Sequence, residues 1–357
     1  MSKDLYLGIE VGGTKLQLAV GTGNGDRLAA VERRQVDPSR GATGILEQID
    51  SAASALLSRF NVRAIGVGFG GPVDAADGRV VKSHQISGWE NAPLRDWCQC
   101  TLGKPTLVGN DCDAAALAEA RFGAGQGKRI VFYVTVGTGV GGGLVIEGEL
   151  HGAGRPAVAE IGHLRPGPHA DHPDDTVESI SSGWGIAAAV RARLSGEVVA
   201  PFDALGPEGP RQTPLQRLKR LADAADADEE YAADLWSRCG GDFERLDSRL
   251  IAQAASEGNE LAREVLGHAT QTLGWAIAQV ATLVAPEVVV VGGGVALMGD
   301  PLFFTPVRAA AQKYVFPPLA SSFEIVPAKL GELVVVHGAL AFAADSRCDG
   351  KPGAIGR

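Results

Sequence analysis

Two glycine-rich turns carry the clearest chemistry in this sequence. Gly12-Gly13-Thr14-Lys15 follows an apolar run at 5–9, and the stretch from Gly137 to Gly143 (Gly-Thr-Gly-Val-Gly-Gly-Gly) follows another at 130–136. Turns that lack Cβ atoms let backbone N–H groups converge on an anion, and threonine hydroxyls add further donors. Two such turns facing each other would hold a polyphosphate from both sides. The pattern therefore predicts a phosphoryl-transfer enzyme.

A competing interpretation is a dinucleotide-binding fingerprint. Gly137 to Gly142 satisfies G-x-G-x-x-G. Glu160 lies about as far downstream in the sequence as the acid that binds ribose in that fingerprint. That fingerprint requires the glycines to open a helix. The residues that follow, Leu144 to Ile146 and then Gly148, are instead typical of a short strand and a turn. The sequence also lacks G-x-x-x-x-G-K-[ST], the common phosphate-binding loop. We therefore interpret each glycine-rich turn as the tip of a β-hairpin, with an apolar segment, 16–20 or 144–146, following it.

Asp111 is the candidate catalytic base. An apolar run at 106–108 ends at Gly109-Asn110-Asp111, and an alanine-rich helix is expected from Asp113 through Arg121. Open α/β sheets bind ligands at the carboxyl ends of such strands. Transfer of a phosphoryl group to an alcohol needs a carboxylate that orients the hydroxyl and accepts its proton. The alternative is that Asp111 only caps the helix. Asp113 is placed to cap it equally well, which leaves Asp111 for chemistry.

Glu160, His163 and Glu178 form a second candidate group. Gly162 allows a tight turn in Glu-Ile-Gly-His, so that Glu160 and His163 can point into one cleft. Two carboxylates and an imidazole suit the neighbouring hydroxyls of a sugar, each of which is both donor and acceptor. The alternative is a surface ion pair on a helix. Gly162 and the nearby prolines argue against a helix and leave the two interpretations open.

Gly292-Gly293-Gly294 follows a run of four valines and precedes Val295-Ala296. A backbone flattened by glycine can lie under a nucleotide base or ribose. Taken alone, the same triplet is equally well a tight turn from a strand to a helix.

Composition narrows the class of protein. The chain has 357 residues, of which 45% are hydrophobic and 21% charged, enough for two globular domains. Its net charge of −9 argues against a nucleic-acid partner, which requires a positive footprint. The longest apolar run is too short for a membrane span, and five cysteines without a regular framework suggest free thiols in the cytoplasm. The 48 glycines are expected at strand ends.

The elements that position these residues follow a pattern that occurs twice. A strand-rich opening, a helix, a strand and a further helix are expected in each half, and we interpret this as a duplicated architecture. The segment 195–250, rich in alanine and charged residues, is expected to be an inserted helical surface element. The expected elements include strands at 5–9, 16–20, 28–35, 64–69, 106–108, 130–136, 143–146 and 287–291, and helices at 41–60 and 259–285.

Taken in order, these pieces resemble the ROK family of sugar kinases and repressors, in the actin-like, hexokinase-like ATPase superfamily. The resemblance spans about residues 5–345. The matching motifs are Gly12-Gly13-Thr14-Lys15, Gly71-Pro72-Val73-Asp74, Gly88 to Leu94, Asn110-Asp111 with Ala114 to Glu119, Gly137 to Gly143, Glu160 to His163, Glu178 through Gly185, and Gly292 to Gly294.

The resemblance implies an α/β fold of two ribonuclease-H-like (actin-like ATPase) domains with ATP and a hexose in the cleft between them. The domains would span 1–128 and 129–337, with a final helix at about 338–346 returning to the first. Asp111 would take the proton from a sugar hydroxyl, usually the 6-hydroxyl. The sugar would be held by Gly71, Asn110, Asp111, Glu160, His163 and Glu178. The phosphates would be held by Gly12, Gly13, Thr14, Lys15, Gly137, Thr138 and Gly139, the adenosine by Gly293 and Gly294, and Mg²⁺ near Glu10.

Two departures from the family pattern bear on the metals. The acid at the end of the first strand is Glu10, where aspartate is usual. The family's cysteine zinc motif, which would lie between His163 and Glu178, is missing. A structural zinc is therefore not expected. His169, Asp171 and His172 stand in its place and are interpreted as a polar loop rather than as metal ligands.

The resulting hypothesis is a cytoplasmic, ATP-dependent kinase that phosphorylates glucose, with a homodimer expected from family habit. Fructose, mannose, an N-acetylhexosamine as acceptor, and polyphosphate as donor remain open. So does a catalytically silent sugar-binding protein. The family's transcription factors carry an N-terminal helix-turn-helix domain, which is not expected here because the first strand begins by about residue 5.

Overall fold

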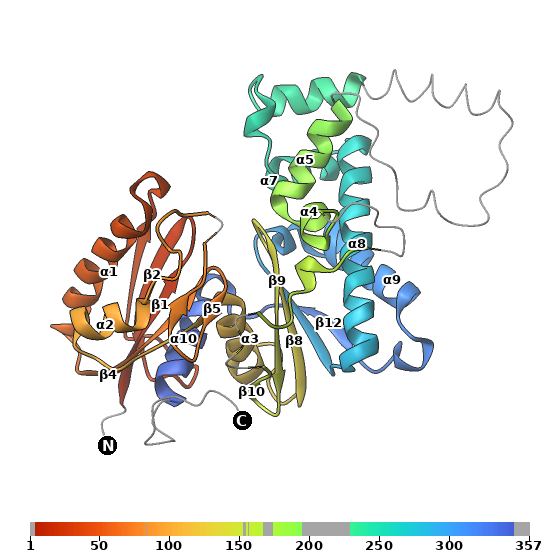
Figure 1. Cartoon of the computed structure of the whole chain (residues 1–357). Helices are drawn as coiled ribbons and strands as arrows, with labels where there is room; N and C mark the ends of the chain where they lie inside the picture. Colours follow the sequence, from red (N-terminus) through yellow and green to blue (C-terminus); the bar gives the residue numbers. More distant parts are fainter. Residues whose placement is uncertain are drawn as a thin grey trace, which may run out of the picture.

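The strands of the computed structural model form two sheets with the same connectivity (Figure 1). The structure describes residues 4–83, 85–152, 155, 157–166, 174–194 and 229–345. Among these, the first five-stranded sheet has the order β3-β2-β1-β4-β7 and the second the order β10-β9-β8-β11-β12, with a separate two-stranded β5-β6 ribbon. The strands are β1 (Leu5–Val11), β2 (Lys15–Gly21), β3 (Ala30–Gln35), β4 (Val62–Phe69), β5 (Val73–Asp74), β6 (Arg79–Val80), β7 (Thr106–Asn110), β8 (Ile130–Val136), β9 (Val140–Ile146), β10 (Glu149–Leu150), β11 (Val288–Gly292) and β12 (Glu324–Pro327).

Strand direction repeats as well as strand order. In the first sheet β1-β2 and β2-β3 are antiparallel and β1-β4 and β4-β7 are parallel. In the second sheet β8-β9 and β9-β10 are antiparallel and β8-β11 and β11-β12 are parallel. Each sheet thus begins with a hairpin and adds two parallel strands. The predicted hairpins and the duplicated architecture are confirmed.

Burial along the strands follows their place in the sheets. The parallel strand β11 reads Val-Val-Val-Val-Gly and is buried at every position, as expected of a strand covered on both faces. The edge strand β3 alternates between half-buried and exposed side chains, which suits a strand with one free edge.

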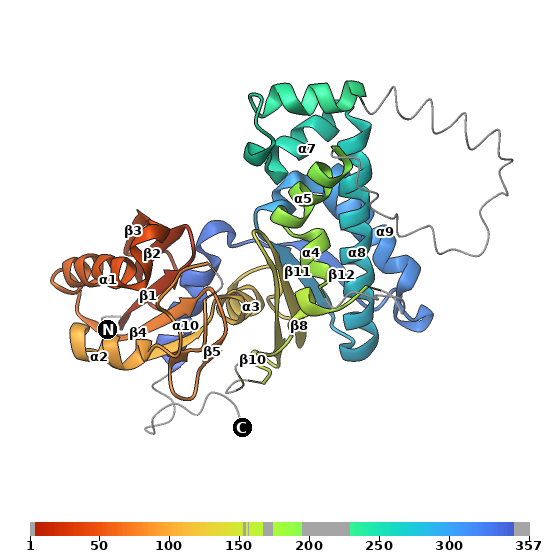
Figure 2. The ribbon, with the colours of Figure 1, turned by 45° about the horizontal axis from the view of Figure 1, so that its top comes forward.

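Helices cover both faces of each sheet (Figures 1 and 2). α1 and α2 lie on the outer face of the first sheet, α8 and α9 on the outer face of the second, and α3 and α10 pack against each other between the two sheets. The helices are α1 (Gly41–Leu57), α2 (Leu94–Leu102), α3 (Asp111–Phe122), α4 (Val177–Ser181), α5 (Gly183–Leu194), α7 (Ser248–Ser256), α8 (Glu260–Val284), α9 (Thr305–Tyr314) and α10 (Val334–Asp345). Short 3₁₀ turns span Pro38–Arg40, Ile161–His163, Phe243–Arg245, Val295–Met298, Pro317–Leu319 and Gly331–Leu333, and a π-helical turn spans Asp300–Phe304.

Glycines inside strands and helices allow the central helices to approach closely. A Cβ added to Gly66 in β4 would lie 1.8 Å from the carbonyl oxygen of Ala339 in α10. A Cβ added to Gly338 in α10 would lie 1.9 Å from the carbonyl oxygen of Ala114 in α3. The prediction that glycines gather at strand ends is therefore only partly right, because several serve helix packing instead.

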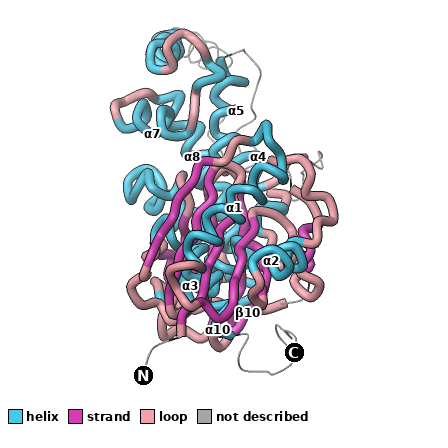
Figure 3. Tube along the Cα trace, turned by 90° about the vertical axis from the view of Figure 1, so that its left-hand side faces the viewer, coloured by secondary structure: helices cyan, strands magenta, loops and turns pink. Residues whose placement is uncertain are grey.

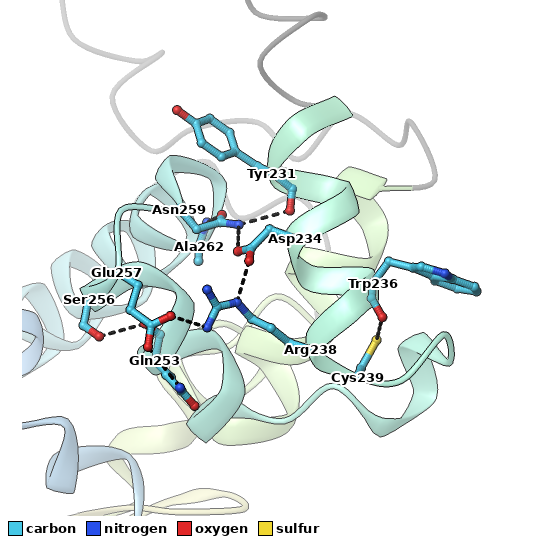
Figure 4. Close-up of polar contacts among 10 residues, drawn as sticks. All are labelled: Tyr231, Asp234, Trp236, Arg238, Cys239, Gln253, Ser256, Glu257, Asn259 and Ala262. Atoms are coloured by element: carbon cyan, nitrogen blue, oxygen red, sulfur yellow. Dashed lines mark hydrogen bonds and ion pairs between the residues drawn. The ribbon is translucent and has the colours of Figure 1, made fainter.

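A helical lobe stands beyond the ends of the second sheet's strands, and α5 and α7 belong to it (Figure 3). Of the predicted insertion 195–250, residues 195–228 lie outside the described residues, whereas 229–238 and α7 are helical. Arg238 bonds to Asp234 at 2.8 Å and to Glu257 at 2.6 Å, and Asn259 donates to Asp234 at 2.8 Å (Figure 4). Because Asn259 also caps α8, this polar network fixes the lobe to the long helix that backs the second sheet.

None of the helices in the described part of the chain is both long enough and apolar enough to span a lipid bilayer.

Candidate active site

The start of α3 brings polar side chains to the carboxyl end of β7. Asn110 caps the helix, because its Oδ1 accepts from the amides of Cys112 at 2.7 Å and Asp113 at 3.3 Å. The Asn110 Nδ2 donates to the carbonyl of Gly71 at 2.9 Å and so ties this corner to the end of β4. The prediction that Asp113 caps the helix is wrong, since the cap is Asn110, three residues earlier.

Asp111 faces the end of the first glycine hairpin. Its Oδ1 accepts from the Cys112 amide at 2.8 Å, and its Oδ2 lies beside Gly70. A Cβ added to Gly70 would lie 3.4 Å from that Oδ2 and 3.7 Å from the Cα of Gly12. Burial raises the pKa of Asp111 to about 6, and the nearby Glu10 carboxylate adds to the increase. The predicted base and the first hairpin are therefore neighbours.

A pocket of about 480 Å³ opens in front of Asp111. Residues from both sheets line it, including Glu10, Lys15, Asp111, Thr135, Gly293 and Gly294. The first hairpin, the candidate base and the glycine triplet after β11 thus border one space. Chemistry at Asp111 would take place between the two sheets.

Glu10 is buried at the wall of this pocket and is held by two side chains from β2. Gln17 donates to its Oε2 at 2.8 Å, and the Lys15 ammonium lies 3.2 Å from its Oε1. Burial raises the pKa of Glu10, although Lys15 and Gln17 work in the opposite direction. Gln17 also donates to the carbonyl of Glu332 at 2.9 Å. The hairpin is thereby linked to the segment that leads into α10.

The second hairpin turns at residues 137–139, and the turn is fixed from α4 and α5. Glu178 Oε2 accepts from the Val140 amide at 2.8 Å, and Gly183 N donates to the carbonyl of Gly137 at 2.8 Å. A Cβ added to Gly137 would lie 4.0 Å from the amide nitrogen of Gly294. This hairpin tip therefore adjoins the glycine triplet at the pocket.

The glycine run from Gly137 to Gly143 has two different jobs, which the sequence prediction did not separate. Only 137–139 form the turn, and Gly141 to Gly143 lie inside β9. A Cβ on Gly141 would lie 2.4 Å from Cys112 Sγ, and one on Gly143 would lie 2.6 Å from Ala116 Cβ. Gly141 and Gly143 therefore let α3 pack directly on the strand.

Glu160 and His163 lie beside β9 on a single 3₁₀ turn, Ile161–His163. No α-helix forms there, as predicted, and Gly162 fits because an added Cβ would lie 2.0 Å from the carbonyl oxygen of Val140. Partial loss of water raises the pKa of Glu160, with His163 opposing the shift and Glu178 adding to it. The structure thus brings Glu160, His163 and Glu178 into one group.

Asp113 joins this group through the charge of Glu160. Burial raises the pKa of Asp113 to about 7, and the carboxylates of Glu160 and Asp111 contribute. Sequence reasoning gave Asp113 only a capping role. The available signal was that Asp113 lies in the same first helical turn as Asp111.

The glycine triplet after β11 is a strand-to-helix turn that also lines the pocket. Gly293 has a φ of 92°, and an added Cβ would lie 2.4 Å from the carbonyl oxygen of Val136. A 3₁₀ turn, Val295–Met298, follows, and its Leu297 is 84% exposed at the pocket rim. The interpretation as a turn that ends a strand is confirmed, and contact with a nucleotide stays a prediction.

Sequence reasoning missed several pocket residues. They are Cys112, Tyr133, Thr135, and the segment from the last residue of β12 onward that includes Pro327, Ala328, Gly331 and Glu332. The duplicated topology offered a signal for the last group, because β12 holds the same place in its sheet as β7, whose end carries Asp111. His169, Asp171 and His172 lie outside the described residues. Within the residues the structure does describe, no group of three or more His, Cys, Asp or Glu side chains is arranged to hold a metal ion.

The sequence and the structure both match known proteins over nearly their full lengths. The family model of the ROK family matches residues 6–346. A glucokinase from Halalkalibacterium halodurans is 30% identical over 348 residues, which cover 95% of this chain and 94% of that protein. An N-acetylmannosamine kinase from Escherichia coli is 28% identical over 297 residues, or 82% of this chain and 83% of that protein.

Among solved structures, a ROK family glucokinase from Streptomyces griseus in complex with glucose and AMPPNP matches with a TM-score of 0.75 at 28% identity, covering 96% of this chain and 99% of that one. The match confirms the predicted fold class. Together with the family model, it shows that this chain belongs to the ROK family.

Proposed function

We propose that this chain is an ATP-dependent sugar kinase that phosphorylates the 6-hydroxyl of glucose, with Asp111 as general base. The observation that carries the proposal is the place of Asp111, which lies beside the first hairpin tip in a pocket lined from both sheets. Similarity to a glucokinase and to a glucokinase structure with glucose and AMPPNP supports the choice of substrates.

In the proposed reaction the 6-hydroxyl oxygen of the sugar attacks the γ-phosphorus of ATP. The bond between that phosphorus and the bridging oxygen of ADP breaks, and the hydroxyl proton passes to the Asp111 carboxylate. With a pKa of about 6, Asp111 is mostly ionised at neutral pH and can accept this proton. Burial also keeps its basicity higher than that of an exposed aspartate.

We assign sugar binding to the polar groups around α3. The sugar hydroxyls would bind the side chains of Asn110, Asp111, Glu160, His163 and Glu178. The backbone of Gly71, which is bonded to Asn110, would form the adjoining wall of the site. Charged acceptors discriminate strongly against analogues that lack a hydroxyl, because a buried partner would be left unpaired.

We assign nucleotide binding to the three glycine turns. The phosphates would lie between Gly12, Gly13, Thr14 and Lys15 on one side and Gly137, Thr138 and Gly139 on the other, and Gly293 with Gly294 would face the adenosine. Lys15 lines the pocket and pairs with Glu10. Its flexible ammonium can move to a phosphate while remaining near the acid.

The residues at the pocket wall fit a magnesium ion held through water. Mg²⁺ bound with a nucleotide usually uses one or two carboxylates together with phosphate oxygens. Glu10 lines the pocket and accepts one bond from Gln17 and one from Lys15, and a carboxylate has about four lone-pair positions. We therefore propose Glu10 as its anchor. The ion would neutralise charge that develops on the phosphates.

Several finer features belong to the same proposal. The two domains, 1–128 and 129–337, with the final helix at about 338–346 packed on the first domain, would close on the substrates and exclude water. The protein would act in the cytoplasm as a homodimer. The E. coli relative favours an N-acetylhexosamine as the second candidate acceptor.

The test is a coupled assay of ADP release over glucose, fructose, mannose, N-acetylglucosamine and N-acetylmannosamine, with ATP and with polyphosphate as donors. We expect the highest kcat/KM for glucose with ATP, and ³¹P–¹H correlation should place the product phosphate on C6. Turnover only with an N-acetylhexosamine would make that sugar, and not glucose, the acceptor. Binding of sugars without any turnover would make this chain a sugar-binding protein.

A further inference from the structure

The carboxylate of Glu178 is bonded to the backbone of the second glycine hairpin. Its Oε2 accepts from the Val140 amide at 2.8 Å, one residue after the turn 137–139. Glu178 is half-buried on α4, whose start is fixed by a capping box between Thr176 and Ser179. A side chain assigned to sugar binding thus already holds a part of the proposed phosphate site.

Gly139 is shaped by this contact. A Cβ added to Gly139 would lie 2.5 Å from Glu178 Oε2, so the carboxylate occupies the space that any side chain there would fill. A second bond runs from Gly183 N to the carbonyl of Gly137 at 2.8 Å. The segment from Glu178 to Gly183 therefore holds the turn at both of its ends.

We propose that Glu178 is a positioning residue for nucleotide binding, in addition to its assigned contact with the sugar. By holding Val140, it fixes the direction in which the amides of Thr138 and Gly139 point. This role rests on the proposed function, because it takes the phosphates to bind at the 137–139 turn.

The sign of the effect separates this role from simple electrostatics. A carboxylate close to a polyphosphate repels it, so removal of Glu178 would tighten nucleotide binding if charge alone mattered. Loss of preorganisation acts in the opposite direction. Removal of Glu178 would loosen the turn, and ordering it again when the phosphates bind would weaken nucleotide binding. A hydrogen bond to a charged acceptor is strong enough for the second effect to prevail.

The experiment measures the dissociation constant of Mg·AMPPNP by calorimetry with no sugar present. Glu178→Ala should weaken nucleotide binding about 10-fold. Glu178→Gln keeps an oxygen that accepts from Val140 and should stay within about 3-fold of the native protein. Glu160→Ala is the matched control for charge, because it removes a carboxylate of the same group for which no bond to the hairpin is seen, and we expect nucleotide affinity equal to or tighter than native.

A second measurement needs no ligand. The Val140 amide should exchange with deuterium at least about 10-fold faster in Glu178→Ala than in the native protein or in Glu178→Gln. Unchanged exchange, or nucleotide affinity in Glu178→Ala equal to or tighter than native, overturns the proposal. Failure of the native protein to bind AMPPNP, with exchange at Val140 altered as expected, would instead count against ATP as donor.

Discussion

The two glycine hairpins share one topology but differ in what surrounds their tips. At the first tip, a Cβ added to Gly13 would lie 1.6 Å from Oε1 of Gln85, the end of a flexible side chain from the loop before α2. Ser83 Oγ holds that loop by accepting from the Gln85 amide at 3.3 Å and the Ile86 amide at 3.2 Å. At the second tip, the neighbours are the bonded Glu178 carboxylate and the backbone of Gly183.

The difference shows that the duplicated sheets kept their strand geometry and acquired different supports. Backbone hydrogen bonds hold both tips, since Val36 N donates to the carbonyl of Thr14 at 3.0 Å in the first. The second tip is held in addition by the Glu178 carboxylate, whereas the first is covered by a side chain that can move. The N-terminus of α3 joins the two regions, because Asp111 faces Gly70 and Gly12 while Asp113 lies near Glu160. Changes on the second side and on α3 should therefore cost more than changes at the first tip.

The largest effect is expected where the two regions meet. Asp111→Asn keeps the size of the side chain but removes the base, so kcat should fall by about 10²–10⁴-fold. The dissociation constant for glucose should change by no more than a few fold, since the amide retains an acceptor oxygen. Steady-state kinetics with calorimetry of glucose binding measures both. Turnover close to the native rate would remove Asp111 from the role of base.

A second prediction concerns the hydrogen-bonded tip. Gly139→Ala places a methyl group 2.5 Å from Glu178 Oε2 and should break the bond to Val140, which lowers kcat/KM for ATP about 10- to 100-fold. Gly137→Ala is the matched control in the same turn, because its Cβ would only approach Gly294 N at 4.0 Å. Its kcat/KM should remain within about 3-fold of native. Equal losses in the two variants would show that the Glu178 contact does not matter.

A third prediction concerns stability on the α3 side. The pKa of Asp113 is raised to about 7, so its ionisation disfavours the folded state increasingly as pH rises from about 4 to 7. Asp113→Asn removes that cost. Its free energy of unfolding relative to native should be higher at pH 8 than at pH 5 by about 2–3 kcal/mol. Urea unfolding at the two pH values measures this, and an identical difference at both would contradict the pKa shift.

The smallest effect is expected at the first tip. Gly13→Ala should raise KM for ATP only a few fold, because the methyl group needs only the Gln85 side chain to move. Gln85→Ala should remove most of this penalty in the double variant. A double-mutant cycle on KM measures the coupling. A large penalty that Gln85→Ala leaves in place would mean that the first tip is as rigid as the second.

The sequence predicted the features that depend on local pattern. Both hairpins, the long helix α8 and the place of Asp111 at the end of β7 follow from apolar runs, periodicity and glycine turns, all of which act over a few residues. The resemblance to the ROK family added the order in which these pieces assemble.

Features that depend on contacts between distant segments could not be predicted in this way. The cap at Asn110 was missed because Asp113 satisfies the same local rule, and the deciding bond to Gly71 joins residues 39 apart. The role of Gly141 and Gly143 depends on how closely α3 packs on β9, and the place of Gln85 over Gly13 depends on a loop between two other elements. Neither contact leaves a mark in the spacing of nearby residues.

A crystal structure of the protein with glucose and AMPPNP tests the central claim most directly. The account predicts that amides of both hairpin tips contact the phosphates and that the glucose 6-hydroxyl lies within hydrogen-bond distance of the Asp111 carboxylate. Phosphates bound at only one tip, or a sugar whose hydroxyls all lie away from Asp111, would contradict it.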